Sequence, residues 1–153
     1  MLKENHKVAI YLEGHFSTDY GKMGIGVLRY LSNQIVAVID SKNNGKNTNE
    51  FNSIKRSVPI VSTLDAAVSN GAEVLILGIA PSGGKIPEAW FKVIESAISK
   101  NLSIINGLHD TLLSKYKNSL RNNQWIWDVR VPQFIPEIAS GKAAKLKNKR
   151  ILC

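Results

Sequence analysis

Two pairs of polar residues in the second half of the chain have side chains that could do acid–base or ion-pair chemistry. His109 and Asp110 follow a short apolar run, and a histidine at a strand end could act as a general base or bind phosphate. Asp128 and Arg130 lie on the same face of a predicted strand and could pair with each other or with a ligand. For the first pair a simpler interpretation also stands, in which Asp110 caps the following helix and His109 is a surface side chain.

A glycine-rich turn is the first candidate for a binding site. Residues 74–80 form an almost continuous apolar run, typical of a buried central strand, which ends in Pro81-Ser82-Gly83-Gly84. In open α/β sheets, ligands bind at the turns that leave the carboxyl ends of strands. Gly83 and Gly84 could expose backbone N–H groups to an anion, and the alternative is a plain tight turn.

Two common nucleotide-binding motifs are incomplete. Residues 78–85 approach the phosphate loop G-x-x-x-x-G-K-[ST], but Ile86 stands where a magnesium-binding hydroxyl is needed. We therefore do not expect this chain alone to hydrolyse a nucleotide. The fingerprint G-x-G-x-x-G is also absent after the first predicted strand, although Asp40 ends the second, where an acidic residue could bind ribose hydroxyls or cap its own loop.

Hydrophobic periodicity predicts the elements that would carry these residues. The predicted strands cover residues 7–12, 35–39, 59–61, 74–80, 102–105 and 125–129. The predicted helices cover 23–31, 64–70 with Ser62 as its cap, 87–100 and 111–120, while 41–48 is predicted to be a polar loop. Strands and helices alternate, so we predict an α/β fold with a parallel sheet of five to six strands in the order 3-2-1-4-5-6 or a shortened form of it.

Composition narrows the classes of partner. The net charge of the 153-residue chain is +8, but five of its 20 Lys and Arg residues lie in the last twelve positions, and no predicted helix concentrates basic residues. We therefore expect no nucleic-acid partner. The lone Cys153 rules out an internal disulfide, and no second His or Cys lies at ligand spacing from His109, so no metal site is expected. Without a signal-like apolar segment after Met1 we expect a cytoplasmic protein and no membrane partner.

Several loop motifs, taken in order, resemble those of one bacterial family. They are Glu13-Gly14, Val38-Ile39-Asp40-Ser41 with Gly45-Lys46, Gly78-Ile79-Ala80-Pro81 with Gly83-Gly84, Gly107-Leu108-His109-Asp110 and Trp127-Asp128-Val129-Arg130. Over about residues 7–152 the chain resembles the amino-terminal domain of the family called domain of unknown function 1611.

That resemblance implies a two-domain protein with a Rossmann-like amino-terminal domain, helices on both faces of its sheet, and a carboxy-terminal phosphate-loop domain. Some members are implicated in N-acetylation of D-amino acids, and others carry an epimerase/dehydratase label. On this basis residues 1–140 should form the Rossmann-like nucleotide-binding domain, and residues 141–153 a basic linker and the first strand of the phosphate-loop domain. The sequence stops where the glycine-rich loop would follow, so we expect a fragment or half of a split protein, whose activity would need the phosphate-loop domain.

A second similarity suggests the cofactor. Gly21-Lys22, Gly45-Lys46 and Ala80-Pro81 occupy places comparable to loops of the CoA-binding domain of succinyl-CoA synthetases. Lysines and helix amino termini offset the charge of nucleotide phosphates. The expected cofactor is therefore acetyl-CoA or another nucleotide.

Together these resemblances imply a role for each candidate residue at the strand ends. Lys46 and the Gly83-Gly84 turn would hold phosphate and Asp40 a ribose, with Glu13 and Pro81 completing the cofactor site. His109, Asp128 and Arg130 would act on a small-molecule acyl acceptor. The alternatives are a noncatalytic domain that docks the phosphate-loop domain in cis or in trans, and an NAD-binding epimerase/dehydratase-like domain. A homo-oligomer is compatible with each of these hypotheses.

Overall fold

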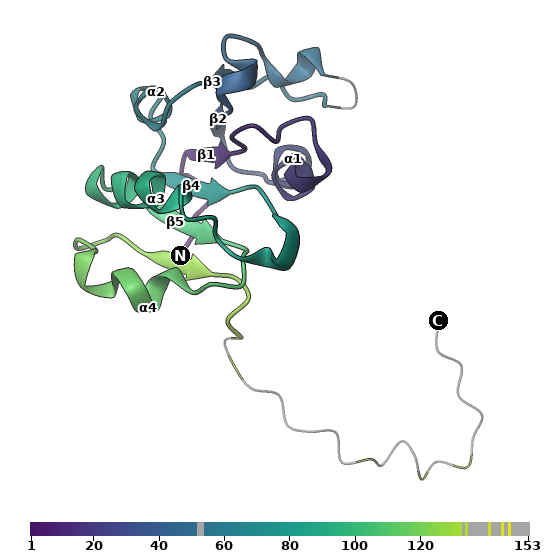
Figure 1. Cartoon of the computed structure of the whole chain (residues 1–153), viewed down its shortest axis with the longest axis vertical. Coiled ribbons are helices and arrows are strands. Elements are labelled where there is room, and N and C mark those ends of the chain that lie inside the picture. The colour runs from purple at the N-terminus through teal and green to yellow at the C-terminus, as the bar shows by residue number, and fades with distance from the viewer. Residues whose placement is uncertain (52–53, 133, 135–140, 142–144, 146, 148–153) are drawn as a thin grey trace.

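Six short strands form one parallel sheet at the centre of the protein (Figure 1). The computed structural model describes residues 1–51, 54–132, 134, 141, 145 and 147. The strands are β1 (Val8–Tyr11), β2 (Ile35–Ile39), β3 (Ile60–Val61), β4 (Val74–Leu77), β5 (Ser103–Asn106) and β6 (Ile126–Asp128). Their order is β3-β2-β1-β4-β5-β6, which confirms the predicted order and the Rossmann-like α/β class.

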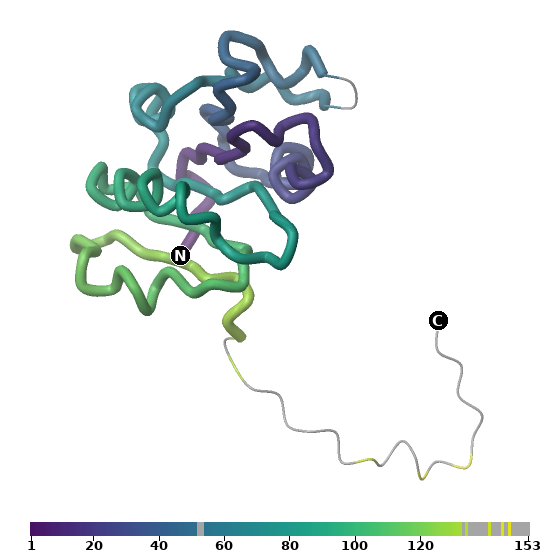
Figure 2. The backbone as a smooth tube through the Cα atoms, in the orientation of Figure 1, coloured from purple at the N-terminus to yellow at the C-terminus, as the bar shows by residue number. Residues whose placement is uncertain are grey.

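The three central strands are buried over their whole length because the sheet is covered on both faces. Every residue of β1, β2 and β4 is buried, which explains their continuous apolar sequences. Ile10 of β1 lies opposite Val38 of β2 and Ile76 of β4, and the three side chains belong to one continuous core. The backbone trace in Figure 2 shows the chain moving outward from β1 to β3 and returning to add β4, β5 and β6 on the other side.

Four α-helices in the described part of the chain lie between successive strands, and only 3-10 turns lie between β2 and β3. The helices are α1 (Lys22–Tyr30), α2 (Leu64–Ser69), α3 (Trp90–Ser99) and α4 (Leu112–Tyr116), and short 3-10 turns lie at 19–21, 41–43, 48–50, 82–84 and 117–119. Neighbouring side chains show the two faces: Leu12, just after β1, packs against Gly24 of α1, whereas Tyr11 of β1 packs edge-on against Trp90 of α3. Figure 1 shows α1 on one side of the sheet and α2 and α3 on the other. No helix in the described part of the chain is long and apolar enough to cross a membrane.

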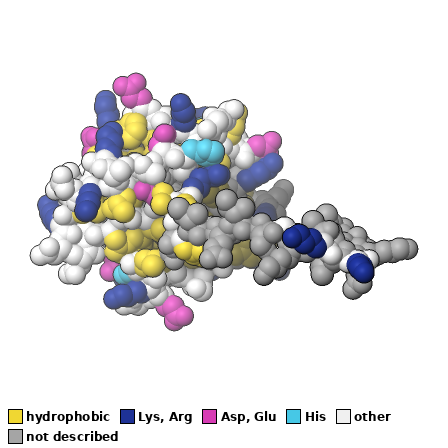
Figure 3. All heavy atoms as spheres, turned by 90° about the horizontal axis from the view of Figure 1, so that it is seen from below, with side chains coloured by type: hydrophobic (Ala, Val, Ile, Leu, Met, Phe, Trp, Pro, Cys, Tyr) yellow, Lys and Arg dark blue, Asp and Glu magenta, His cyan; other side chains and the backbone are white. Residues whose placement is uncertain are grey.

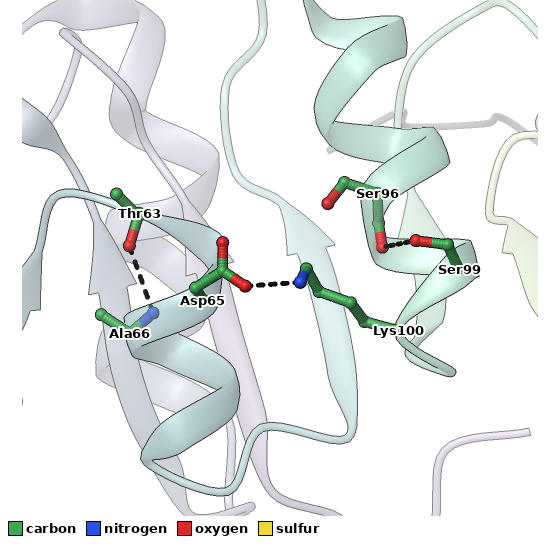
Figure 4. A network of polar contacts seen from close by, with 6 residues as sticks. All are labelled: Thr63, Asp65, Ala66, Ser96, Ser99 and Lys100. Atoms are coloured by element: carbon green, nitrogen blue, oxygen red, sulfur yellow. Dashed lines mark hydrogen bonds and ion pairs between the residues drawn. The ribbon is translucent and has the colours of Figure 1, made fainter.

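The residue predicted to cap α2 was wrong. The cap of α2 is Thr63 rather than Ser62, because the Thr63 hydroxyl accepts the N–H of Ala66 at 3.2 Å (Figure 4). The predicted polar loop at residues 41–48 contains one 3-10 turn and the start of another. An exposed ion pair between Asp65 and Lys100 then joins the first turn of α2 to the end of α3.

The boundary predicted at residue 140 and the strand predicted at residues 150–153 lie outside the described residues.

Candidate functional site

The candidate residues come from loops that leave the carboxyl ends of the parallel strands and therefore share one edge of the sheet. The chain changes direction between β1 and β4, which are neighbours in the sheet. At this switch point the loops after β1 and β4 diverge, and sheets of this class bind ligands there. The amino end of α1 closes the switch point from one side, because Gly24 N–H donates to Gly78 C=O at 2.8 Å.

Asp40, at the end of β2, organises two loops. Its side chain is fully buried, and its oxygens accept hydrogen bonds from the N–H groups of Gly14 at 2.9 Å and Lys42 at 3.2 Å and from the amide of Asn43 at 2.7 Å. The carboxylate therefore caps its own loop, as one sequence interpretation held. In this conformation it has no exposed surface with which to contact a ribose.

Glu13 makes the reciprocal connection from β1 to β2. Its carboxylate accepts the Ser41 N–H at 2.9 Å and also the Ser41 hydroxyl. Gly14 follows with φ +71°, a left-handed backbone conformation that glycine adopts without strain. Glu13 and Asp40 thus cross-link the two loops, and both carboxylates are used by the chain itself.

The glycine turn after β4 is held by the loop after β5. Gly83 and Gly84 both have positive φ, 77° and 65°, and Gly84 N–H donates to Pro81 C=O at 2.9 Å. The backbone N–H of His109 then donates to Gly84 C=O at 2.8 Å. The structure therefore brings four candidate residues, Pro81, Gly83, Gly84 and His109, into one place.

Asp110 also connects the loop after β5 to the loop after β4. Its carboxylate accepts the N–H of Ile86 at 2.7 Å, so it does not cap the following helix, as the simpler sequence interpretation expected. His109 itself is exposed, with its imidazole beside the α-carbon of Gly84. The loops after β4 and β5 are thereby fixed to each other at two backbone points.

The helix cap comes instead from Asp128, at the end of β6. One carboxylate oxygen accepts Leu112 N–H at 3.0 Å and the other accepts Leu113 N–H at 2.9 Å. Asn106, fully buried at the end of β5, donates to the first of these oxygens at 2.8 Å. Asp128 therefore holds the amino end of α4 against the sheet.

Asn106 is a site residue that the sequence interpretation missed. Its amide also donates to Asp110 C=O at 2.7 Å, and its oxygen accepts Leu108 N–H at 3.0 Å, so it shapes the loop that carries His109. A polar residue that ends an otherwise apolar strand was the signal that could have identified it.

Arg130 does not bind Asp128. Its Nε donates to Gly107 C=O at 2.8 Å. The two ion pairs found in the described part of the chain, Lys22–Asp19 and Lys100–Asp65, both lie elsewhere. Arg130 is exposed, and the bond from Nε leaves its terminal guanidinium N–H groups without a hydrogen-bond or ion-pair partner among the described residues.

Lysine side chains at this edge of the sheet are more available to a ligand than the carboxylates that accept backbone N–H groups. Lys46 is exposed, with Nζ 5.4 Å from the Phe51 ring centre, and its backbone is fixed by Ile60 N–H, which donates to Lys46 C=O at 2.8 Å. Lys42 reaches Gly14 C=O only at 3.4 Å, and Lys85 is exposed beside the glycine turn. Within the described residues no group of three or more His, Cys, Asp or Glu could hold a metal ion.

Comparison of the sequence with known proteins gives a matching family model and two named relatives. A family model described as a domain of unknown function (DUF1611_N), Rossmann-like domain, matches residues 41–132. Two proteins named D-glutamate N-acetyltransferase, from Pseudoalteromonas sp and Tritonibacter scottomollicae, are 36% and 34% identical over 56% and 59% of this chain. The aligned parts span only 26% and 27% of those proteins.

A solved structure is also similar. The crystal structure of a DUF1611 family protein from Anabaena variabilis matches with a TM-score of 0.84 and 39% identity over 93% of this chain. The match covers 42% of that protein, so more than half of the solved relative has no counterpart in this chain.

Proposed function

The chain belongs to the DUF1611_N family of Rossmann-like domains, and we propose that it binds acetyl-CoA or another nucleotide for an enzyme that N-acetylates an amino acid. It is related to proteins named D-glutamate N-acetyltransferase, and it spans about a quarter of their length. The acetyltransferase activity, the amino-acid substrate and the cytoplasmic location are part of this proposal.

The observation that carries the proposal is that carboxylates at the strand ends are bonded within the chain, whereas lysines at the same edge are exposed. Four carboxylates there accept backbone N–H groups within the chain; they belong to Glu13, Asp40, Asp110 and Asp128. Lys42, Lys46 and Lys85 are exposed at the same edge, beside a turn of two glycines. A surface whose carboxylates are hydrogen-bonded within the chain and whose lysines are exposed suits the phosphates of a nucleotide.

Within this proposal the residues divide into contact and positioning groups. Lys46 and the Gly83-Gly84 turn would bind phosphate, because the lysine carries a positive charge and the turn lacks side chains that would keep an anion away. Glu13 and Asp40 would position the loops on which Lys42 and Lys46 lie. Because the Asp40 carboxylate is buried, atoms of the neighbouring loops would bind the ribose in its place.

The acyl acceptor would lie beside the loops after β5 and β6. Bound acetyl-CoA would supply an activated acetyl thioester. His109, exposed at the glycine turn, would accept the proton that the acceptor ammonium must lose before its nitrogen can attack. The terminal guanidinium N–H groups of Arg130 would bind the acceptor carboxylate, and Asp128 would act through its cap on α4.

Ligand-dependent melting of the purified chain tests this function. Acetyl-CoA, CoA, NAD, NADP and ATP would be compared, since a ligand at about a hundredfold excess over its Kd adds about 2.7 kcal/mol to apparent stability. We expect acetyl-CoA and CoA to raise Tm and Lys46→Ala to reduce the shift. Lys55→Ala is the matched control, an exposed lysine that precedes β3. A chain that melts cooperatively but shifts with none of the five ligands would contradict the proposal.

A second candidate is a noncatalytic domain that docks a phosphate-loop domain in cis or in trans. The observation in its favour is length, since the solved relative is more than twice as long as the part that this chain matches. The same melting experiment separates the candidates, because a docking domain would respond to none of the small ligands. A shift with NAD alone would instead favour the epimerase/dehydratase-like hypothesis.

A further inference from the structure

The two edges of the sheet differ in how their backbone groups are used. The loop between β2 and β3 bonds to the backbone groups on the outer edge of β3. Gly45 N–H donates to Ile60 C=O at 3.0 Å, and Ile60 N–H donates to Lys46 C=O at 2.8 Å. Thr48 N–H likewise donates to Val58 C=O at 2.9 Å. The fold thus closes this edge against further strand pairing.

At the other end, β6 is the last strand among the described residues. Two hydrogen bonds show which backbone groups of this segment face β5. Ile104 N–H donates to Trp125 C=O at 3.0 Å, and Val129 N–H donates to Asn106 C=O at 2.9 Å. Backbone groups alternate in direction along a strand, so the N–H and C=O of Ile126 point away from β5. This edge therefore presents a donor and an acceptor from the same residue.

An apolar groove runs along the open edge. Its volume is about 560 Å³, and it is lined mainly by residues of β6, α4 and the segment after β6, with Trp125, Trp127 and Leu113 among them. Seven large hydrophobic side chains in the described part of the chain are exposed, and five of them lie on the groove or in the segment that follows β6: Met1, Leu113, Val129, Val131 and Phe134. In Figure 3, hydrophobic side chains gather on the face seen from below Figure 1.

We propose that this β6 edge and groove form a homodimer interface, in which the β6 strands of two copies pair antiparallel about a twofold axis. A second copy satisfies each of these features at once. Its Ile126 C=O and N–H can pair with the outward N–H and C=O of Ile126 in the first copy, and its groove presents the same apolar side chains. The pairing would extend the sheet across the two subunits.

The charges of the groove agree with self-association. Two charged side chains line it, those of Lys117 and Asp128. The Asp128 carboxylate is buried and already bonded to α4 and Asn106, which leaves Lys117 and the α-ammonium group of Met1 as the charged groups of the lining residues on each copy. A groove without free acidic groups and with an apolar lining does not select a strongly basic partner, and contiguous exposed apolar side chains are typical of protein interfaces.

The test is the mass of the 153-residue chain in solution, by sedimentation equilibrium over a wide range of concentration. We expect a dimer, and we expect the double variant Leu113→Glu with Val131→Glu to raise its dissociation constant by about tenfold or more, because like charges would face each other across the axis. Both side chains are exposed, 42% and 48%, so the substitutions leave the core unchanged. Tyr30→Glu is the matched control, since Tyr30 is 84% exposed at the end of α1 and should leave the dimer intact.

Two results would overturn the proposal: a wild-type chain that is monomeric at every concentration, or a dimer of equal strength in the double variant. Circular dichroism of each variant verifies that it is folded. Hydrogen exchange of the Ile126 amide gives a second measurement, because dimerisation should slow exchange at this edge. If the chain is monomeric while Trp125 and Trp127 are shielded from fluorescence quenchers, the groove is covered by the chain's own following residues and the dimer is excluded.

Discussion

His109 and Gly84 are in direct contact across two loops: a methyl group placed on Gly84 would lie 2.3 Å from the imidazole Cδ2 of His109. The backbone hydrogen bond from His109 N–H to Gly84 C=O fixes the same contact from the other side. The position of the one candidate proton acceptor at this edge therefore depends on the absence of a side chain at residue 84.

Gly84→Ala should displace the His109 ring and destabilise the fold by about 1–2 kcal/mol, the usual cost of a β-carbon in the left-handed region. Gly83→Ala is the control, because its φ of 77° imposes a similar strain while nothing lies within 4 Å of the added methyl. Urea unfolding should show similar losses in the two variants. Only Gly84→Ala should change the NMR shifts of the His109 imidazole, and equal shifts in both variants would exclude the steric explanation.

Two glycines of α1 should respond to alanine in opposite directions. A methyl on Gly24 would lie 2.7 Å from the nearest side-chain atom of Leu12, a fully buried residue, so Gly24→Ala should cost about 1–3 kcal/mol by overpacking. Gly26 has nothing within 4 Å, and Gly26→Ala should stabilise the helix by about 0.5–1 kcal/mol. The midpoints of urea unfolding measure both effects. A stabilised Gly24→Ala variant would show that α1 does not pack this closely on β1.

Strand positions followed from the sequence because burial on both faces requires continuous apolar runs, and 35–39 was predicted to the residue. The residues at which strands and helices begin or end were less predictable. The run 74–80 was predicted as one strand, but β4 ends at Leu77, since Gly78 C=O turns to accept Gly24 N–H from α1. The helix predicted from residue 87 begins at Trp90, after a turn in which Trp90 N–H donates to Pro87 C=O.

The polar contacts of the site depend on register, which a single sequence does not contain. Asp128 lies opposite Asn106 in the parallel ladder, and only that pairing brings its carboxylate to the amino end of α4. Sequence proximity suggested Arg130 as the partner instead. His109 and Lys46 were predicted to lie in the connections after β5 and β2, and the structure places them there as exposed residues, because the order of strands and loops along the chain is a local feature of the sequence.

Asp128→Asn should destabilise the protein by about 1–3 kcal/mol, because the new amide would point an N–H group at donors that now share a buried carboxylate. Asp65→Asn is the matched control: its ion pair with Lys100 is exposed, and such pairs contribute about 0–1 kcal/mol. Hydrogen exchange should show faster exchange of the Leu112 and Leu113 amides in Asp128→Asn. Unchanged exchange there would contradict the capping role.

Tyr116 on α4 should link stability to alkaline pH. Burial raises the pKa of its hydroxyl from 10.0 to about 12, assisted by the 2.9 Å hydrogen bond that it donates to Glu95 and by the charge of that carboxylate. A folded-state pKa above the unfolded value means that the contribution of Tyr116 is complete below pH 10 and is lost as the pH rises through about 12.

The measurement is the difference between wild type and Tyr116→Phe, which isolates this residue from Tyr11, whose pKa is also raised to about 12 by burial and then by Glu13. The free energy of unfolding of wild type should fall more steeply above pH 10 than that of the variant. Glu95→Gln should lower the pKa of Tyr116, followed by tyrosinate absorbance, but not as far as 10.0, because burial is the largest cause of the shift. A pKa that returns fully to 10.0 in Glu95→Gln would show that Glu95, rather than burial, controls this tyrosine.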